Sequence, residues 1–256
     1  MTDAAGINLQ LADRVVLVTG GVRGVGAGIS AVFAGQGATV VTCARRPVDG
    51  LPYEFHACDV RDDDAVKTLV DGIVARHGRL DVVVNNAGGS PFALAADASP
   101  KFSSKIVQLN LLGPLLVSQH ANEVMQAQAQ GGSIVNISSV SAHRPSPGTA
   151  AYGAAKAGLD NLTTTLAVEW APKVRVNSVV VGMVETEQSE LFYGDAESVA
   201  AVAATVPLGR LAKPSDIGWA AAFLACDMAS YISGAALAVH GGGEPPSYLE
   251  ASSANK

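Results

Sequence analysis

RVVLVTGGVRGVG, residues 14–26, joins a β-branched apolar run to a glycine-rich turn. A short apolar run that ends in glycines is typical of a buried strand in a parallel sheet. The residues that follow have a helical pattern as far as Phe33, and Gly35 and Gly37 then end the helix. Strand, glycine turn and helix in this order predict the first half of a βαβ unit that binds a dinucleotide.

Three glycines in the turn, Gly20, Gly24 and Gly26, explain how a ligand would be held there. They allow a tight bend and let a pyrophosphate approach the positive end of the helix. The spacing is G-x-x-x-G-x-G, not G-x-G-x-x-G, so the physical mechanism applies while the usual fingerprint does not. A plain turn before a helix is the alternative.

The cofactor type is predicted from the end of the second strand, residues 38–43. An acidic residue near this point holds the ribose hydroxyls of NAD, whereas an arginine suits a 2′-phosphate. Arg45 and Arg46 follow the strand, no acid takes that place, and Arg23 in the glycine turn is a further candidate. We therefore favour NADP(H), with NAD(H) as the alternative; solvated surface arginines are the simpler explanation.

The rest of the chain continues to alternate strands with helices. Further strands are expected at 53–57, 80–84, 132–138, 174–181 and 237–240, and helices at 62–77, 102–125 with a bend at 113–114, 151–170 and 214–228. No linker or repeat interrupts the pattern. We predict one α/β domain over residues 1–256, a Rossmann-type doubly wound parallel sheet of about seven strands with helices on both faces.

Tyr152 and Lys156 form the strongest candidate for proton chemistry. Four residues apart on a helix, they project from one face, and an ammonium beside a phenol favours the phenolate. An ordinary surface pair is the alternative for this spacing alone. Ser139 ends the strand at 132–138, and a hydrolase built from Ser139 and His143 is disfavoured because no G-x-S-x-G surrounds the serine.

Two asparagine-containing segments complete the candidate site. The strand at 80–84 ends in NNAGG, residues 85–89, whose small residues would let a ligand lie against the backbone; a tight turn is the alternative. Asn110 lies in an apolar helical stretch and needs hydrogen-bond partners there. It either links helix to strand or holds an ordered water, and the sequence favours neither.

The composition excludes several classes of protein. A net charge of −6 without a basic block argues against nucleic-acid binding. No apolar run approaches the roughly 20 residues that span a bilayer, and the first residues lack a secretory signal, so a cytoplasmic location is expected. Three cysteines without a C-x-x-C argue against disulfides and metal binding, and the acids at 62–64 fit a helix start.

Five motifs together resemble the short-chain dehydrogenase/reductase family over essentially the whole chain. They are T-G-x-x-x-G-x-G at 19–26, N-N-A-G at 85–88, Asn110, Ser139, and Y-x-x-x-K at 152–156. The sequence as a whole resembles those of 3-oxoacyl-acyl-carrier-protein reductases and of bacterial enzymes that act in steroid or acyl-CoA catabolism.

The resemblance implies roles for individual residues. Tyr152 would exchange the proton of the substrate oxygen, Ser139 would hydrogen-bond that oxygen, Lys156 would bias Tyr152 and bind the ribose, and Asn110 would hold a relay water. Asp59 and Val60 would face the adenine, and Val184 and Thr186 the carboxamide. The implied cofactor-binding set is Gly20, Arg23, Gly24, Val25, Gly26, Arg45, Arg46, Asp59, Val60, Asn86, Ala87, Gly88, Tyr152, Lys156, Gly182, Val184 and Thr186.

The resemblance also implies an activity and an assembly. The expected function is NADP(H)-dependent interconversion of a ketone and a secondary alcohol, with a 3-oxoacyl thioester or steroid-derived substrate, in a homo-oligomer. Residues 186–208 would form a substrate lid, with Leu191, Phe192 and Tyr193 either lining a pocket or packing on the domain. The alternatives are a catalytically silent dinucleotide sensor and an epimerase or dehydratase.

Two positions depart from the family pattern. Val181-Gly182 replaces the common Pro-Gly, and His240-Gly241-Gly242 replaces Asp-Gly-Gly. A longer tail, residues 241–256, follows the second of these departures. It leaves open whether the oligomer is the usual tetramer or a dimer.

Overall fold

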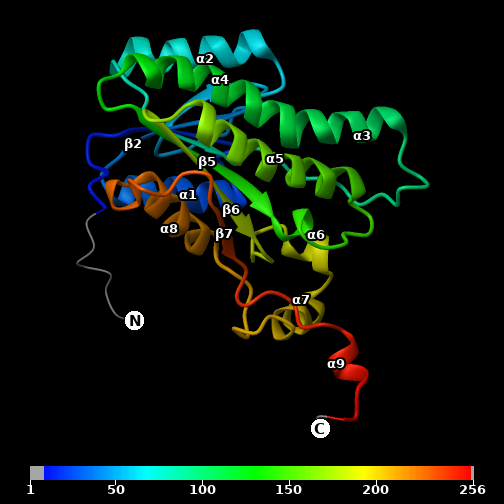
Figure 1. The fold of residues 1–256 in the computed structure, drawn as a ribbon. Coiled ribbons are helices and arrows are strands. Elements are labelled where there is room, and N and C mark those ends of the chain that lie inside the picture. The colour runs from blue at the N-terminus through cyan, green and yellow to red at the C-terminus, as the bar shows by residue number, and fades with distance from the viewer. Residues whose placement is uncertain (1–8, 255–256) are drawn as a thin grey trace.

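A seven-stranded parallel sheet forms the centre of the computed structural model, which describes residues 9–254 (Figure 1). Its order is β3-β2-β1-β4-β5-β6-β7, and every neighbouring pair is parallel. The strands are β1 Val15–Thr19, β2 Thr39–Ala44, β3 Glu54–Ala57, β4 Val82–Asn85, β5 Gly132–Ser139, β6 Val174–Val181 and β7 Ala236–Val239. The predicted doubly wound α/β fold is therefore confirmed.

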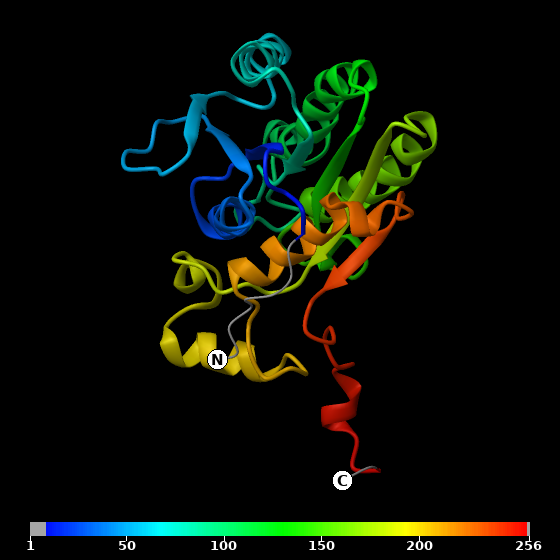
Figure 2. The same cartoon turned by 90° about the vertical axis from the view of Figure 1, so that its left-hand side faces the viewer.

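Helices cover both faces of the sheet, as Figures 1 and 2 show. One face carries α1 Gly24–Gly35 and α8 Pro214–Ala225, and the other carries α2 Asp63–His77, α4 Gly113–Ala127 and α5 Ala150–Glu169. The β-branched side chains of β1 alternate between the two cores: Val16 and Val18 pack toward α1, and Val15 and Leu17 toward α2. A strand buried on both faces explains the continuous apolar run of β1.

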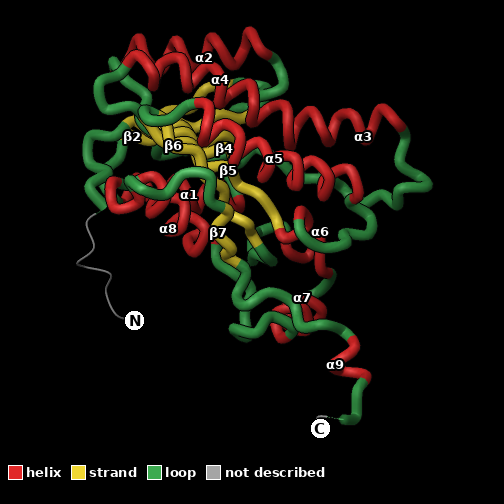
Figure 3. Tube along the Cα trace, in the orientation of Figure 1, coloured by secondary structure: helices red, strands yellow, loops and turns green. Residues whose placement is uncertain are grey.

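Shorter helices lie around this frame, and Figure 3 shows that loops connect most of them. They are α3 Pro100–Val107, α6 Ser189–Tyr193, α7 Ala196–Ala204, α9 Tyr248–Ala251, the π-helical turn η1 Gln108–Leu112, and the 3-10 turns η2 Val140–Ala142 and η3 Asp227–Ala229. α6 and α7 lie beyond the carboxyl ends of the strands, and α9 stands apart from the body (Figures 1 and 2). No helix within residues 9–254 is long and apolar enough to cross a membrane.

Several predicted boundaries need correction. The helix expected at 102–125 is α3, η1 and α4 in succession, beginning at Pro100 behind the capping hydroxyl of Ser99. The irregularity precedes the expected bend at 113–114, because Pro114 stands in the first turn of α4, where its missing N–H costs little. α8 ends at Ala225 rather than at 228, and α6 and α7 occupy much of the expected irregular segment. The expectation that the first residues lack a secretory signal concerns residues 1–8 among others, and these lie outside the described range.

The topology selects one edge of the sheet for ligand binding. The order in which successive strands join the sheet reverses between the parallel neighbours β1 and β4, so the loops after these two strands leave on opposite faces. In open α/β sheets, ligands bind at this crevice beyond the carboxyl ends of the strands. The glycine turn, the NNAGG segment and Ser139 all follow strand ends on this side of the sheet.

Candidate active site

The glycine turn after β1 has the shape that its sequence predicts. Gly20 has a φ of +65° and Gly24 of +52°, in the left-handed region where a side chain adds strain. A Cβ on Gly26 would collide with the carbonyl of Gly20 and with Nδ2 of Asn86. Glycine is therefore required for the backbone to fold back on itself at the start of α1.

The amino end of α1 has no side-chain cap and no acid within its own first turn. Arg23 occupies the N-cap in an extended conformation. The first N–H groups of a helix need acceptors from outside it, and the helix dipole favours a negative charge there. The turn thus fits the pyrophosphate of a dinucleotide.

The NNAG segment is tied to the glycine turn through Thr19. Its Oγ1 accepts hydrogen bonds from the backbone N–H groups of Asn86 and Ala87, each at 3.0 Å. Nδ2 of Asn86 donates to the carbonyls of Thr19 and Gly20 at 3.0 and 3.2 Å. These hydrogen bonds therefore fix the glycine turn and the NNAG segment against each other. The sequence places Thr19 in the first motif but does not predict that its hydroxyl connects the two motifs.

Asn110 links the helix layer to the segment after β4. Its Nδ2 donates to the carbonyls of Gly89 and Ile106, and its Oδ1 accepts from the N–H of Gly89, all at 2.9 Å. The side chain is fully buried inside η1, and π-helical turns occur often at functional sites. The structure shows a link from this helix to the loop after β4 rather than to a strand; the water-holding role stays a prediction.

Ser139, Tyr152 and Lys156 meet at the carboxyl end of β5. The Ser139 hydroxyl acts on the phenol of Tyr152 in the direction that lowers its pKa, and Nζ of Lys156 lies over the Tyr152 ring, 5.6 Å from its centroid. Nζ donates to the carbonyl of Ile137 at 2.7 Å, and a Cβ on Gly88 would lie 3.4 Å from it. The hydroxyl, phenol and ammonium therefore share one space beside the NNAG segment.

Burial governs the ionisation of both titratable groups. Burial raises the pKa of Tyr152, and the hydrogen bond from Ser139 opposes this rise only in part. Burial lowers the pKa of Lys156 to about 8, against the opposing charge of Asp160. The expectation that Lys156 brings the pKa of Tyr152 down is wrong for this arrangement, because desolvation of the phenol dominates.

The three arginines predicted to favour a 2′-phosphate follow the neighbouring strands β1 and β2. Arg23, Arg45 and Arg46 are exposed, and within the described residues none of them has an ion pair or a hydrogen bond through its side chain. Asp59 is held by Arg61, whose NH2 lies 2.6 Å from its carboxylate. The Arg61 hydrogen bond, with a smaller contribution from Arg45, lowers the pKa of Asp59.

Val60 and the segment after β6 close the remaining sides of the crevice. Val60 is buried against Gly113 at the start of α4. Val184 forms a parallel bridge with Ala212, and the methyl group of Thr186 lies near Gly24. Gly182 packs on His240, where a side chain would collide with the histidine backbone. The lid segment therefore begins directly over the glycine turn.

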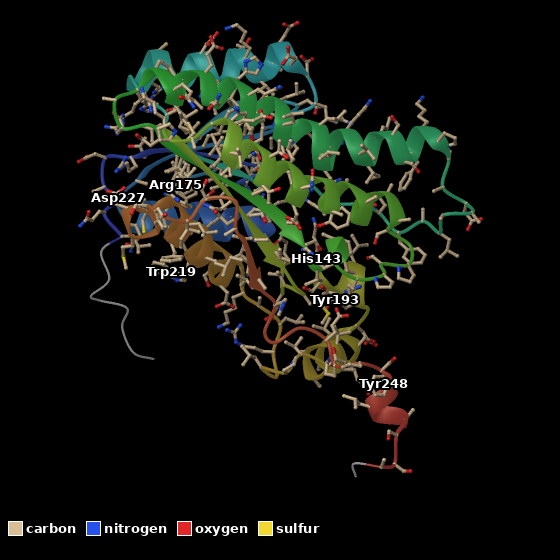
Figure 4. All side chains as sticks on the ribbon, viewed as in Figure 1. His143, Arg175, Tyr193, Trp219, Asp227 and Tyr248 are labelled. Atoms are coloured by element: carbon tan, nitrogen blue, oxygen red, sulfur yellow. The ribbon has the colours of Figure 1, made fainter. Side chains whose placement is uncertain are left out.

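The large side chains of the lid differ in how far they are exposed to solvent. Leu191 and Phe192 are 78% and 61% exposed, whereas Tyr193 is largely covered and burial raises the pKa of its phenol. The backbone of Val184 and the charge of Arg144 act on this phenol and oppose the rise, and Figure 4 shows Tyr193 on α6. Packing therefore describes Tyr193 better than Leu191 and Phe192, which face solvent.

The described residues also show how possible metal ligands and the three cysteines are arranged. Within residues 9–254 no group of three or more His, Cys, Asp or Glu side chains is arranged to hold a metal ion. Cys43, Cys58 and Cys226 are free and buried, as small apolar residues would be.

Asp160 was not recognised from the sequence, although the signal was present. It stands four residues after Lys156 on α5, the same spacing that relates Lys156 to Tyr152. Its carboxylate accepts a hydrogen bond from Ser178 and contacts His143. His143 is thus paired with an acid on α5 rather than with Ser139.

Comparisons with known proteins agree on one family. The family model described as enoyl-(acyl carrier protein) reductase matches residues 20–244. The chain is 35% identical to 3-oxoacyl-acyl-carrier-protein reductase FabG of Thermotoga maritima, covering 91% of this chain and 99% of that protein. It is 38% identical to cis-4-hydroxycyclohexanecarboxylate dehydrogenase of Sinomonas cyclohexanicum, covering 90% and 96%.

A human relative and a solved structure extend this agreement. Human dehydrogenase/reductase SDR family member 4 is 34% identical over 92% of this chain and 88% of its own length. The ligand-free structure of Thermoplasma acidophilum aldohexose dehydrogenase superposes with a TM-score of 0.88 at 32% identity, covering 92% of this chain and 96% of that one. Sequence and fold thus give the same assignment over nearly the full length.

Proposed function

Since the chain belongs to the short-chain dehydrogenase/reductase family of NAD(P)-dependent oxidoreductases, we propose that it interconverts a ketone and a secondary alcohol with NADP(H) and with Tyr152 as general acid and base. The observation that carries this proposal is the buried ammonium of Lys156 over the Tyr152 ring, at the end of β5 where Ser139 lies. These groups lie at the ligand-binding edge of the sheet, next to Gly88.

The raised pKa of Tyr152 suits the direction of reduction. A phenol with a raised pKa keeps its proton at neutral pH, so Tyr152 is ready to donate it to a carbonyl oxygen as that oxygen gains negative charge. Ser139 would donate a hydrogen bond to the same oxygen and stabilise its charge. In the reverse direction, the phenolate accepts the proton of the alcohol.

Lys156 would supply positive charge to the deprotonated form of Tyr152. Its ammonium is buried and has one backbone acceptor, Ile137, which leaves two donors for other partners. A positive charge in a dry site stabilises a phenolate more strongly than it would in water. These two free donors are also available for ribose hydroxyls.

The residues at the crevice support a bound dinucleotide. The uncapped amino end of α1 and the glycine turn suit the pyrophosphate, and Arg23, Arg45 and Arg46 suit an added 2′-phosphate. When bound, the nicotinamide supplies or accepts the hydride at the reacting carbon. The cofactor-binding residues expected from the resemblance are part of this proposal.

The relatives support a range of substrate classes. One is named for 3-oxoacyl groups on acyl carrier protein, one for a hydroxycyclohexanecarboxylate and one for aldohexoses. We propose a small carbonyl compound or its alcohol, with 3-oxoacyl thioesters and steroid-derived ketones first. A panel of these classes with cyclic ketones and sugars, with NADPH and NADP⁺, identifies the substrate.

The first test replaces Tyr152 with phenylalanine. Tyr152→Phe removes the proton donor and keeps the ring, so turnover should fall at least 100-fold while NADPH binding stays within about threefold. Steady-state rates and nicotinamide fluorescence measure the two quantities. Tyr231→Phe, at a fully exposed tyrosine, is the matched control and should keep wild-type rates. Wild-type turnover in Tyr152→Phe would refute the proposed role.

The second test concerns cofactor preference. We expect NADPH to bind about tenfold more tightly than NADH, since a charged hydrogen bond to the 2′-phosphate contributes about 1.5–3 kcal/mol. Arg45→Ser should reduce this preference and leave the NADH dissociation constant unchanged. Arg76→Ser, at a surface arginine on α2, is the control. Equal or tighter binding of NADH to the unaltered protein contradicts the proposal.

A silent dinucleotide sensor is the alternative from another class. It would bind NADPH with the expected preference but transfer no hydride to any member of the panel. The presence of Ser139, Tyr152 and Lys156 together at the end of β5 weighs against it. The substrate panel separates the two functions directly.

A further inference from the structure

Asp160 is a largely buried acid one helical turn beyond Lys156. Its side chain is 12% exposed, and its Oδ1 accepts a hydrogen bond from the Ser178 hydroxyl on β6 at 3.0 Å. Burying a carboxylate is costly unless a partner compensates the charge. A single neutral hydroxyl does not supply that compensation, so the surrounding charges decide the role of Asp160.

Two basic groups face this carboxylate from different elements. Nε2 of His143, in the segment between η2 and α5, lies 3.0 Å from Oδ2. That oxygen has no hydrogen-bond partner within the described chain, so the contact with His143 is electrostatic in character. Lys156, on α5 itself, is the other group, and the charge of Asp160 acts on it. The strands below, β5 and β7, have no titratable side chain, and Arg175 of β6 lies at its opposite end.

Lys156 and Asp160 contact adjoining positions on two neighbouring strands of the sheet. Lys156 contacts the carbonyl of Ile137 on β5, and Asp160 contacts Ser178 on β6. Ile137 pairs with Val179, so the two contact points are only one step apart along neighbouring strands. The carboxylate and the ammonium therefore lie over adjoining positions of the sheet, with the helix spacing fixing them from above.

We propose that Asp160 is a positioning residue for the reaction at Tyr152, acting through Lys156, and that His143 closes the solvent side of its carboxylate. This inference rests on the proposed function. Asp160 touches neither substrate nor cofactor in this scheme; its negative charge keeps Lys156 protonated in a site whose burial favours the neutral amine. His143, 54% exposed, limits the access of water to Oδ2.

The proposal predicts a shift in one limb of the pH profile. Ketone reduction requires a protonated Tyr152 and a charged Lys156, so the rate falls as Lys156 loses its proton near its pKa of about 8. Removing the charge of Asp160 lets Lys156 lose its proton at lower pH. The alkaline limb should then move down by about one pH unit, the scale expected for one nearby charge.

The test is Asp160→Asn, which keeps an acceptor for Ser178. We expect kcat/KM for ketone reduction to fall about fivefold at pH 8, which follows from a one-unit shift of the limb, and to stay within twofold at pH 6, where Lys156 is charged in both proteins. A purely structural role would lower the rate at both pH values. Glu169→Gln, which removes an exposed charge from the same helix, should leave the profile unchanged.

A second variant covers the case in which Asp160→Asn does not fold. His143→Ala changes an exposed ring, and water then reaches Oδ2 and weakens its field at Lys156. The alkaline limb should move in the same direction by a smaller amount. A limb that stays within about 0.2 pH units of the wild type in Asp160→Asn, or moves upward in His143→Ala, overturns the proposal.

A measurement without turnover separates this inference from the proposed function. Lysine labelled with ¹³C at Cε reports its own protonation by NMR, and the Lys156 resonance is the one lost in Lys156→Met. Its titration midpoint should fall in Asp160→Asn whether or not a substrate is known. An unchanged midpoint contradicts the role of Asp160, whereas a lowered midpoint in a protein without turnover contradicts only the proposed function.

Discussion

Lys156 has a proposed role in the reaction, but burying its charged amine lowers the stability of the folded protein. It is 3% exposed, and burial lowers its pKa from the ordinary value near 10.5 to about 8. The folded state therefore binds this proton less tightly than the unfolded chain does. The resulting loss of stability is fully present below about pH 8 and disappears as the pH rises toward 10.5.

Lys156→Met should therefore stabilise the fold while it abolishes turnover. The pKa difference corresponds to about 3 kcal/mol at neutral pH, and the lost hydrogen bond to Ile137 offsets about 1 kcal/mol of it. For a chain of this size the melting temperature at pH 7 should rise by about 5 °C. Differential scanning calorimetry of the cofactor-free protein measures the change.

The pH dependence distinguishes this explanation from better packing of methionine. The advantage of Lys156→Met should shrink between pH 8 and pH 9.5, because the wild-type amine becomes neutral over that range. Lys105→Met, at an exposed lysine of α3, should change the free energy of unfolding by no more than about 0.5 kcal/mol. An advantage that is constant with pH would show that burial of the charge is not its source.

At the scale of elements, the sequence predicts the frame because its signals are local. The apolar run of β1, the glycines that follow it and the helical spacing of α1 each restrict backbone angles within a few residues. The parallel order of the strands then follows from the alternation of strands and helices. The Tyr152–Lys156 pair was predictable for the same reason, since one helix fixes both side chains.

Features that depend on contacts distant in sequence could not be predicted in this way. The π-helical turn η1 exists around Asn110, whose side chain bonds to Gly89, 21 residues earlier. The pKa of Tyr152 depends on how completely the fold covers the ring, which no spacing reveals. Asp160 and His143 meet only because the segment before α5 folds back along that helix. In each case the partner is set by tertiary packing.

At the scale of the molecule, the candidate site is assembled from segments far apart in the chain. The glycine turn, the NNAG segment, the end of β5, the start of α5 and the beginning of the lid converge at one end of the sheet. The outer edge of β7, the last strand of the sheet, lies away from these segments. β7 ends the sheet, so its outer edge has no strand neighbour within the described residues.

The surface around β7 leads us to predict a homo-oligomer. Trp219 of α8, Met228 of η3 and Tyr231 are 41%, 67% and 103% exposed, and Figure 4 shows Trp219 on α8. Exposed large apolar side chains in the segments that lead to an open edge strand are typical of a protein interface. We expect a dimer or tetramer in solution, with a second copy of the chain covering this surface.

Light scattering after size-exclusion chromatography tests the prediction through a double substitution. Trp219→Glu with Met228→Glu places two charges in an interface that must exclude water, so the mass should fall to a smaller species. Val48→Glu, at an exposed apolar residue near the opposite edge of the sheet, should leave the mass unchanged. A wild-type chain that elutes with a mass of 26.0 kDa contradicts the prediction. An oligomer that survives the double substitution places the interface on another surface, because two buried carboxylates without partners would not be tolerated at this one.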